Sequence, residues 1–328
     1  MVFRLITLLP LIIITSVLLY LMFLTNLPQM LYIKSVRNVY FDCTQFVPDD
    51  YVYKMKPGQC RLKNLEYDTV LTHDADGFRN QRNTLDFDVA AIGASQTQGV
   101  GVADDQTYPA ILETEYHYRT RNLGLGACAT LRELEILSQY GKDAKYVVIQ
   151  YTRSDFGENT AALNFGKDEF RSQVETRWRN LIANYQDGKR QGYKKPIHDL
   201  AVMVTSLSFE SKAAWRKRII TTRNMEAEAA AFSRIIERSR ELLEGKRLII
   251  LESSDFGLNS PRFVEAFGSE LRKINWLSYR LIDSTKVLSF ADHFFLDDHP
   301  KPRGQKKLAT AVAAEITQWE SAEPIIRK

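Results

Sequence analysis

A serine and a histidine–aspartate pair carry the clearest chemical potential in this sequence. Ser95 comes directly after the short apolar run 89–93, at the point where a helix can begin. Asp297 and His299 lie two positions apart near the C-terminal end. A carboxylate so close to an imidazole can fix its tautomer, and the imidazole can then accept the proton of a serine hydroxyl. These residue types predict a nucleophilic serine.

Each of these residues also has a structural interpretation. A serine at the start of a helix is a common N-cap, so Ser95 alone does not identify a catalytic site. An Asp-x-His spacing is frequent by chance, and Asp298 is interpreted as a solvated or capping residue. The other histidines lack a comparable arrangement of neighbours and are interpreted as structural or surface residues: His73, His117, His198 and His293.

Two loops that follow predicted strands could stabilise a developing oxyanion. Residues 124–127 form a glycine-containing turn, and residues 151–155 follow another strand. Backbone N–H groups in such turns can point at a negatively charged oxygen, and the N–H of Ser95 can do the same. Ordinary turn glycines and a helix cap are the structural alternatives at these two places.

All of these stretches lie near predicted element ends. Short apolar runs predict strands at 89–93, 146–151, 247–251 and 286–290, with a strand-to-loop junction at 122–126. Helical patterns cover about 107–116, 131–140, 225–243 and 303–319. The alternation predicts an α/β fold with three layers, α/β/α, around a mostly parallel sheet of flavodoxin-like type. Such sheets bind ligands beyond the carboxyl ends of their strands, where these candidate residues would gather.

The composition is that of a globular protein with one unusual segment. Of 328 residues, 45% are hydrophobic and 26% charged, with a net charge of +4, which excludes a disordered chain, a collagen-like repeat and a polytopic membrane protein. Residues 5–33 contain no charged residue, and the run 5–24 would span about 30 Å as a helix. We expect an uncleaved N-terminal transmembrane signal anchor; a cleaved signal peptide and a buried helix are the alternatives.

The flanking charges leave the orientation of this anchor open. Arg4 precedes the apolar run, whereas Lys34 and Arg37 follow it, so the two sides nearly balance. Cys43 and Cys60 are 17 positions apart in a loop-like stretch. A disulfide between them would require an oxidising compartment, and two unpaired thiols are the alternative. We expect the hydrophilic body to be extracytoplasmic.

The chain is expected to divide at changes of composition. Residues 1–33 would be the anchor, residues 34–85 an irregular cap or lead-in, and residues 86–320 one α/β domain. Within it, about 160–224 is a basic helical insertion, either a surface for anionic glycans or lipid headgroups or a solvated segment. Cys128 is interpreted as a buried small residue. We expect no metal site, no organic cofactor and no nucleic-acid partner.

In combination, the candidate stretches resemble the SGNH, or GDSL-type, hydrolase superfamily. Residues 93–102 are similar to its nucleophile block. Residues 297–300, with Gly304, are similar to its last block, which precedes a helix. The turn at 124–127 and the stretch 151–155 stand where the second and third blocks are expected.

Upstream, residues 53–58 and 76–79 resemble a lead-in found in many bacterial extracytoplasmic members. The resemblance implies a role for each of three residues. Ser95 would be the nucleophile, His299 the general base and then acid, and Asp297 its orienting partner. The body would lie in the bacterial periplasm or at the cell surface.

The resemblance also implies an oxyanion hole. It would combine the N–H of Ser95 with an N–H of the turn at Gly126 and Ala127, and with a side chain of the third block. Two positions depart from the family pattern. Ser154 stands where the family has an asparagine donor, and Ala94 stands where it has an aspartate.

The activity implied is that of a membrane-anchored serine esterase or O-acyltransferase. Its substrate would be an acyl ester of an extracytoplasmic glycan or lipid, cleaved through an acyl-enzyme. The alternative, motivated by the two departures, is an SGNH-type protein that binds or assembles envelope polysaccharide with little or no catalysis. A third possibility is a cytoplasm-facing thioesterase or lysophospholipase with the reverse topology.

Overall fold

A five-stranded parallel sheet forms the centre of the described part of the chain. The computed structural model describes residues 10–18, 41–63, 66–80, 86–191, 223–253, 259–294, 297 and 299–322. The strands lie in the order β6-β5-β7-β8-β9, so the first strand along the chain has the second and third on its two sides. This is the doubly wound order of a flavodoxin-like sheet. Its members are β5 (Val89–Gly93), β6 (Thr120–Asn122), β7 (Tyr146–Tyr151), β8 (Arg247–Glu252) and β9 (Ser278–Ile282).

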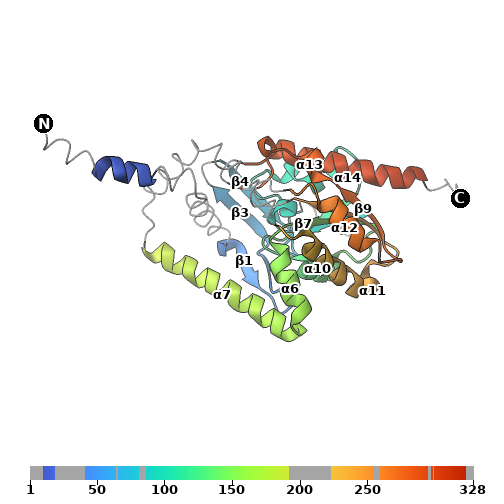
Figure 1. The fold of residues 1–328 in the computed structure, drawn as a ribbon, viewed down its shortest axis with the longest axis horizontal. Helices are drawn as coiled ribbons and strands as arrows, with labels where there is room; N and C mark the ends of the chain where they lie inside the picture. Colours follow the sequence, from blue (N-terminus) through green and yellow to red (C-terminus); the bar gives the residue numbers. More distant parts are fainter. Residues whose placement is uncertain are drawn as a thin grey trace.

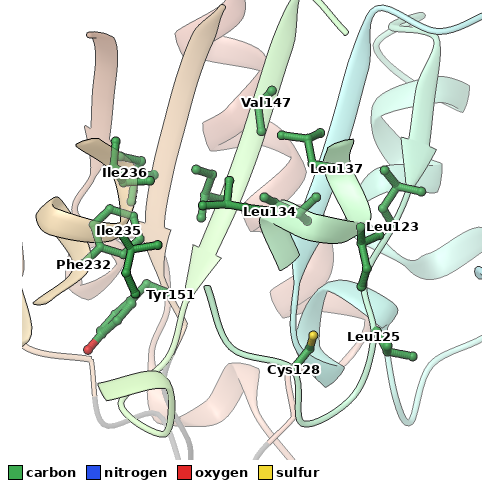
Figure 2. Packing of buried hydrophobic residues seen from close by; sticks show 14 of the residues in the cluster. Leu123, Leu125, Cys128, Leu134, Leu137, Val147, Tyr151, Phe232, Ile235 and Ile236 are labelled. Carbon is green, nitrogen blue, oxygen red and sulfur yellow. The ribbon is translucent and has the colours of Figure 1, made fainter. Parts of the chain in front are cut away.

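Alternating side chains of these strands belong to two separate apolar clusters, one on each face of the sheet. Ala90 and Ile92 of β5 belong to one cluster, and Val89 and Ala91 belong to the other. Figure 2 shows the first cluster, where leucines of one helix and Phe232 of another meet the sheet on the same side. The covering helices are α5 (Thr130–Tyr140), α10 (Met225–Arg238) and α12 (Phe263–Leu271) on that face, and α4 (Tyr108–Thr114) and α14 (Pro302–Ala322) on the other.

This arrangement confirms the predicted α/β fold and its three layers (Figure 1). The predicted strands at 89–93, 146–151 and 247–251 agree with β5, β7 and β8 to within one residue. The remaining helical segments are short, apart from α7: α3 (Ser95–Gln98), α6 (Asp155–Asn164), α7 (Lys167–Gln191), α11 (Arg240–Leu243), α13 (Ser284–Val287), η1 (Phe41–Cys43), η2 (Asp104–Gln106) and η4 (Phe290–Asp292).

The strand predicted at 286–290 is wrong. The last strand of the described residues is β9, which lies earlier in the sequence and pairs with β8. Asp283 directly after β9 accepts hydrogen bonds from the N–H and the hydroxyl of Thr285, and this N-cap starts α13 where a strand was expected. A short apolar run does not by itself distinguish strand from helix, and here the cap decides.

The segment 41–80, which we call the lead-in segment, is more regular than predicted. It contains two antiparallel hairpins, β1 (Thr44–Phe46) with β2 (Tyr53–Met55) and β3 (Gly58–Lys63) with β4 (Asp68–His73). Its side chains are part of the domain core. The prediction of an irregular cap is therefore wrong for these residues. Tyr51, Tyr53, Met55 and Phe78 join the core on the α5 face, and Cys60, Leu62, Tyr67 and Leu71 form a third cluster with Val100, Val102 and Phe294.

A disulfide joins the two hairpins. Cys43 and Cys60 are bonded, with Cα atoms 5.9 Å apart. Replacing both with serine is expected to lower the free energy of unfolding by about 2–4 kcal/mol, because the bond restricts the unfolded chain. Denaturant unfolding of the parent and the double variant measures the difference. Equal stability of the two proteins under oxidising conditions would contradict the expectation.

The predicted membrane anchor lies mostly outside the described residues. Residues 10–18 are helical, with Leu11, Ile12, Ile13, Ile14, Val17 and Leu18 at least half exposed. Among the helices of the described ranges, none has both the length and the apolar character to cross a bilayer. In the basic insertion, residues 192–222 also lie outside the described part, while α6 and α7 account for its beginning.

His73, at the end of β4, gives the fold a pH dependence. Burial lowers the pKa of His73 to about 4, and the Arg79 guanidinium nearby acts in the same direction. Because this pKa lies below the ordinary value of 6.5, the unfolded chain takes up the proton first as the pH falls. The contribution of His73 is therefore complete above pH 6.5 and is lost on the way down to pH 4, by as much as about 3 kcal/mol.

A His73→Gln variant separates this effect from that of the acidic residues, because glutamine is polar but does not titrate. The difference in unfolding free energy between parent and variant should change steadily between pH 6.5 and pH 4, to the parent's disadvantage as the pH falls. Urea unfolding at a series of pH values measures it. A difference that stays constant across this range would refute the assignment.

Candidate active site

Ser95 is the first residue of α3 and is separated from the end of β5 by Ala94 alone. The turn between them needs Gly93, because a Cβ there would lie 2.2 Å from the hydroxyl oxygen of Thr97 and 2.9 Å from the Gln150 side chain. Ala94, not Ser95, is the N-cap residue of α3. The structure therefore does not use Ser95 as a cap. Its side chain is partly exposed and lies at the edge of the sheet where parallel strands end.

Buried side chains hold the short helix α3 in place. A helix of four residues leaves its carbonyl groups without partners inside the helix. Gln305 of α14 donates to the carbonyl of Gln96 at 3.1 Å, and Asn122 at the end of β6 donates to that of Thr97 at 3.0 Å. Arg79 of the lead-in segment donates to the carbonyls that follow, Gln98, Gly99 and Val102. Three separate elements thus fix the helix that carries Ser95.

The three residues proposed from the sequence meet in one hydrogen-bonded chain. His299 Nε2 lies 2.8 Å from Ser95 Oγ, and His299 Nδ1 lies 2.5 Å from Asp297 Oδ1. His299 and Asp297 are only 3% and 5% exposed. With the Nδ1 proton directed at the carboxylate, the lone pair on Nε2 faces the serine hydroxyl. This geometry allows the imidazole to take the proton of Ser95.

The lead-in segment also supports Asp297. The hydroxyl of Tyr67 donates to Asp297 Oδ2 at 2.5 Å, and the backbone N–H of Asp297 donates to the Glu66 carboxylate at 2.8 Å. Sequence reasoning did not find either residue. Tyr67 is 230 positions from its partner, and nothing in its local pattern marks it as part of the site.

The turn at Gly126 and Ala127 can supply a backbone donor. Ala127 has a φ of +53°, in the left-handed region that favours glycine, and it is exposed. Within the described residues, neither the N–H of Ala127 nor that of Ser95 donates a hydrogen bond. Gly124 in the same loop packs against α3, since a Cβ there would lie 2.4 Å from the backbone nitrogen of Gln98. The loop and the serine helix are thus in direct contact.

Two buried side chains fix the orientation of this turn. Tyr53 Oη donates to the carbonyl of Gly126, and Arg132 donates to the carbonyl of Ala127 at 2.6 Å. In a trans peptide the C=O and the N–H point in opposite directions. Because Tyr53 holds the Gly126 carbonyl, it also fixes the direction of the Ala127 N–H.

Ser154 and Ala94, which depart from the family pattern, lie in different surroundings. Ser154 is exposed, and its hydroxyl lies 2.6 Å from that of Thr152. Asp155 accepts hydrogen bonds from both the N–H and the hydroxyl of Thr152, which shapes this loop after β7. The structure does not bring the Ser154 hydroxyl into contact with the triad. Ala94 is buried and, having no polar side chain, makes no cap hydrogen bond to α3.

The described side chains do not provide a metal site, since no group of three or more His, Cys, Asp or Glu residues among them could hold an ion. Cys128 is buried, as predicted, and burial raises the pKa of its thiol well above the ordinary value. Asp298 and His198 lie outside the described residues.

Comparison with known proteins finds matches among solved structures. No protein-family model matches the chain, and no curated protein does. Among solved structures, one neighbour is a Desulfitobacterium hafniense DCB-2 protein described as lipolytic and of the G-D-S-L family, with 15% identity, a TM-score of 0.39, and coverage of 70% of this chain and 99% of that chain.

A second neighbour is a GDSL-like lipase from Bacteroides thetaiotaomicron VPI-5482, with 12% identity, a TM-score of 0.37, and coverage of 70% of this chain and 88% of that chain. A third, from Bacteroides fragilis NCTC 9343, is described as an acylhydrolase; it has 14% identity, a TM-score of 0.37, and coverage of 70% and 86%. At these identities and TM-scores the likeness transfers no activity to this chain. The fold and the placement of the three residues are those expected from the SGNH resemblance.

Proposed function

We propose that this chain is a serine ester hydrolase of SGNH type, with Ser95 as its nucleophile. The observation that carries the proposal is the continuous chain of hydrogen bonds from Ser95 Oγ through His299 to Asp297. A serine hydroxyl is a weak nucleophile unless a base accepts its proton as it attacks. The buried, oriented imidazole of His299 meets that requirement.

The reaction follows from this geometry in two stages. Ser95 Oγ attacks the ester carbonyl carbon while its proton passes to His299 Nε2, and the resulting imidazolium is stabilised by the Asp297 carboxylate. His299 then gives the proton to the departing alkoxide oxygen, which leaves an acyl group on Ser95. A water molecule, or the hydroxyl of an acceptor, then attacks the acyl carbon while His299 takes its proton. The bond to Ser95 Oγ breaks, and His299 returns the proton to Ser95 as the acid or the new ester leaves.

The oxyanion of each tetrahedral intermediate would be held by backbone N–H groups of Ser95 and Ala127. Without an amide donor at Ser154, this site has one side-chain donor fewer than the family pattern. Loss of one such donor typically costs about 100- to 1,000-fold in turnover. We therefore expect slow turnover of simple esters.

For the substrate, we propose an acyl ester of an extracytoplasmic glycan or lipid, with either hydrolysis or O-acyl transfer as the outcome. The uncharged run at residues 5–24 and the exposed apolar side chains of residues 10–18 favour attachment to a membrane. The Cys43–Cys60 disulfide favours an oxidising compartment over the cytoplasm. Together they support a body held at the outer face of a bacterial membrane.

Fluorophosphonate labelling followed by peptide mapping tests the nucleophile. We expect the parent chain to be labelled on the peptide that contains Ser95, and the Ser95→Ala variant to remain unlabelled. Labelling should also be strongly reduced in His299→Gln, since the base activates the hydroxyl. Failure of the folded parent to react, or equal labelling of the Ser95→Ala variant, would refute the proposal.

A second candidate function is a binding or assembly protein for envelope polysaccharide. It is favoured by the exposed position of Ser154 and by its contact with Thr152, which leave the third donor of the family pattern unsupplied. This alternative predicts an unlabelled Ser95 together with retention of the parent chain on an immobilised envelope polysaccharide.

A further inference from the structure

We propose that Tyr67, in the lead-in segment, is a positioning residue that holds the Asp297 carboxylate in the orientation His299 requires. The inference rests on the proposed function, since it assigns a role within the same site. Its basis is that each oxygen of the carboxylate holds a hydrogen bond from a different residue. Oδ1 lies 2.5 Å from His299 Nδ1, and Oδ2 accepts the hydrogen bond of the Tyr67 hydroxyl at 2.5 Å.

A buried carboxylate such as that of Asp297 needs hydrogen-bond donors around it. Asp297 is 5% exposed, and a buried charge without hydrogen bonds is strongly unfavourable. Rotation of the carboxyl group would exchange the places of Oδ1 and Oδ2. With Tyr67 bound to Oδ2, that rotation breaks two hydrogen bonds, so the plane of the carboxylate and the tilt of the imidazole are both fixed.

The surroundings of Tyr67 are built to hold its ring in this place. Its ring lies 5.0 Å from that of Phe294, measured between centroids, and 8% of the residue is exposed. Gly101 makes room for the two rings, because a Cβ there would lie 2.7 Å from Phe294 and 3.1 Å from Tyr67. The neighbouring Glu66 accepts the backbone N–H of Asp297 at 2.8 Å. Two consecutive residues of the lead-in segment, Glu66 and Tyr67, therefore form hydrogen bonds with the same aspartate.

The lead-in segment also supplies a matched control. Tyr51 is fully buried, and its hydroxyl lies 3.1 Å from that of Tyr140, away from the triad. Replacing either tyrosine with phenylalanine removes the hydroxyl and its hydrogen bond but keeps the buried ring. A merely structural role for Tyr67 would make the two variants behave alike.

Steady-state kinetics of the full-length parent, Tyr67→Phe and Tyr51→Phe with p-nitrophenyl acetate test the proposal. We expect kcat of Tyr67→Phe to fall by about 10- to 100-fold, the loss associated with one hydrogen bond to a charged group, with KM within about 2-fold of the parent. Tyr51→Phe should keep the kcat of the parent. Equal kcat values for Tyr67→Phe and the parent, in a parent that labels on Ser95, would overturn the proposal and leave the proposed function standing.

Proton NMR provides a readout that does not depend on turnover. The His299 Nδ1 proton in a short hydrogen bond to a carboxylate should give a downfield resonance, identified by its absence in His299→Gln. We expect this resonance to shift or broaden in Tyr67→Phe and to stay in place in Tyr51→Phe. An unchanged resonance in Tyr67→Phe would overturn the proposal, even if the parent proved to have no esterase activity.

Discussion

Replacing Ser95 with alanine is expected to lower kcat for an activated acetyl ester by about three to six orders of magnitude. The serine oxygen is the atom that forms the new bond, and an alanine side chain leaves His299 without a proton to accept. The residual rate would come from the backbone donors and from binding alone. Spectrophotometric assay of p-nitrophenol release by the purified full-length chain measures the loss.

Ser138→Ala serves as the matched serine control for this experiment. Ser138 lies on α5, and its hydroxyl donates to the carbonyl of Glu135 at 2.8 Å, away from the triad. We expect this variant to keep the activity of the parent, and both variants to keep the parent's circular dichroism spectrum. Ser95→Ala with activity close to that of the parent would exclude Ser95 as the nucleophile.

The second large effect is expected on stability, from Arg223→Met. The Arg223 side chain is fully buried and bridges Glu228 of α10 and Glu252 at the end of β8. Glu252 also accepts a hydrogen bond from the N–H of Ser260 at 2.6 Å, so the cluster ties three segments together at the carboxyl edge of the sheet. Methionine removes the positive charge that both buried carboxylates share. The cost is expected to be about 3–5 kcal/mol in unfolding free energy.

Urea unfolding of Arg223→Met beside Arg240→Met measures this effect against an exposed ion pair. Arg240 and Glu244 lie one helical turn apart, and both side chains are about half exposed, so loss of that pair should change stability little. We expect the midpoint of Arg223→Met to fall well below those of the parent and the control. Similar midpoints for the two variants would show that the buried cluster contributes no more than a surface pair.

The sequence was sufficient to predict three strands of the sheet and the three residues of the triad, because both depend on local patterns. Buried parallel strands are recognisable as short apolar runs, and β5, β7 and β8 were found in this way. Ser95 and the pair Asp297 and His299 were found from residue types and spacing. The rule that ligands bind beyond the carboxyl ends of parallel strands accounts for Ser95 after β5, whereas Asp297 and His299 reach the site from the stretch before α14.

The elements that were missed depend on contacts rather than on patterns. The strand at 286–290 was wrong because the Asp283 cap starts a helix there, and the strand before it has half-buried side chains that give no clear apolar run. The hairpins of the lead-in segment are short, and their packing against the core cannot be seen in the local sequence. Tyr67 belongs to the site only through a contact made 230 positions away.

The two loops proposed to stabilise the oxyanion show that spacing alone does not predict the contacts of single side chains. Spacing placed Ala127 in the turn expected to supply a backbone donor, and the structure gives this residue a φ of +53°, in the region that favours glycine. Spacing also placed Ser154 at the third donor. Its hydroxyl bonds to Thr152 instead, which depends on the conformation of the loop after β7 and not on residue type.

The central claim, that Ser95 carries an acyl group during the reaction, is tested most directly by mass spectrometry. The parent chain is mixed with an activated acetyl ester, quenched with acid during turnover and digested. We predict one acetyl group on the peptide that contains Ser95, and none on the corresponding peptide of Ser95→Ala. Turnover by the parent without acetylation of Ser95, or with the acetyl group on another residue, would contradict the account.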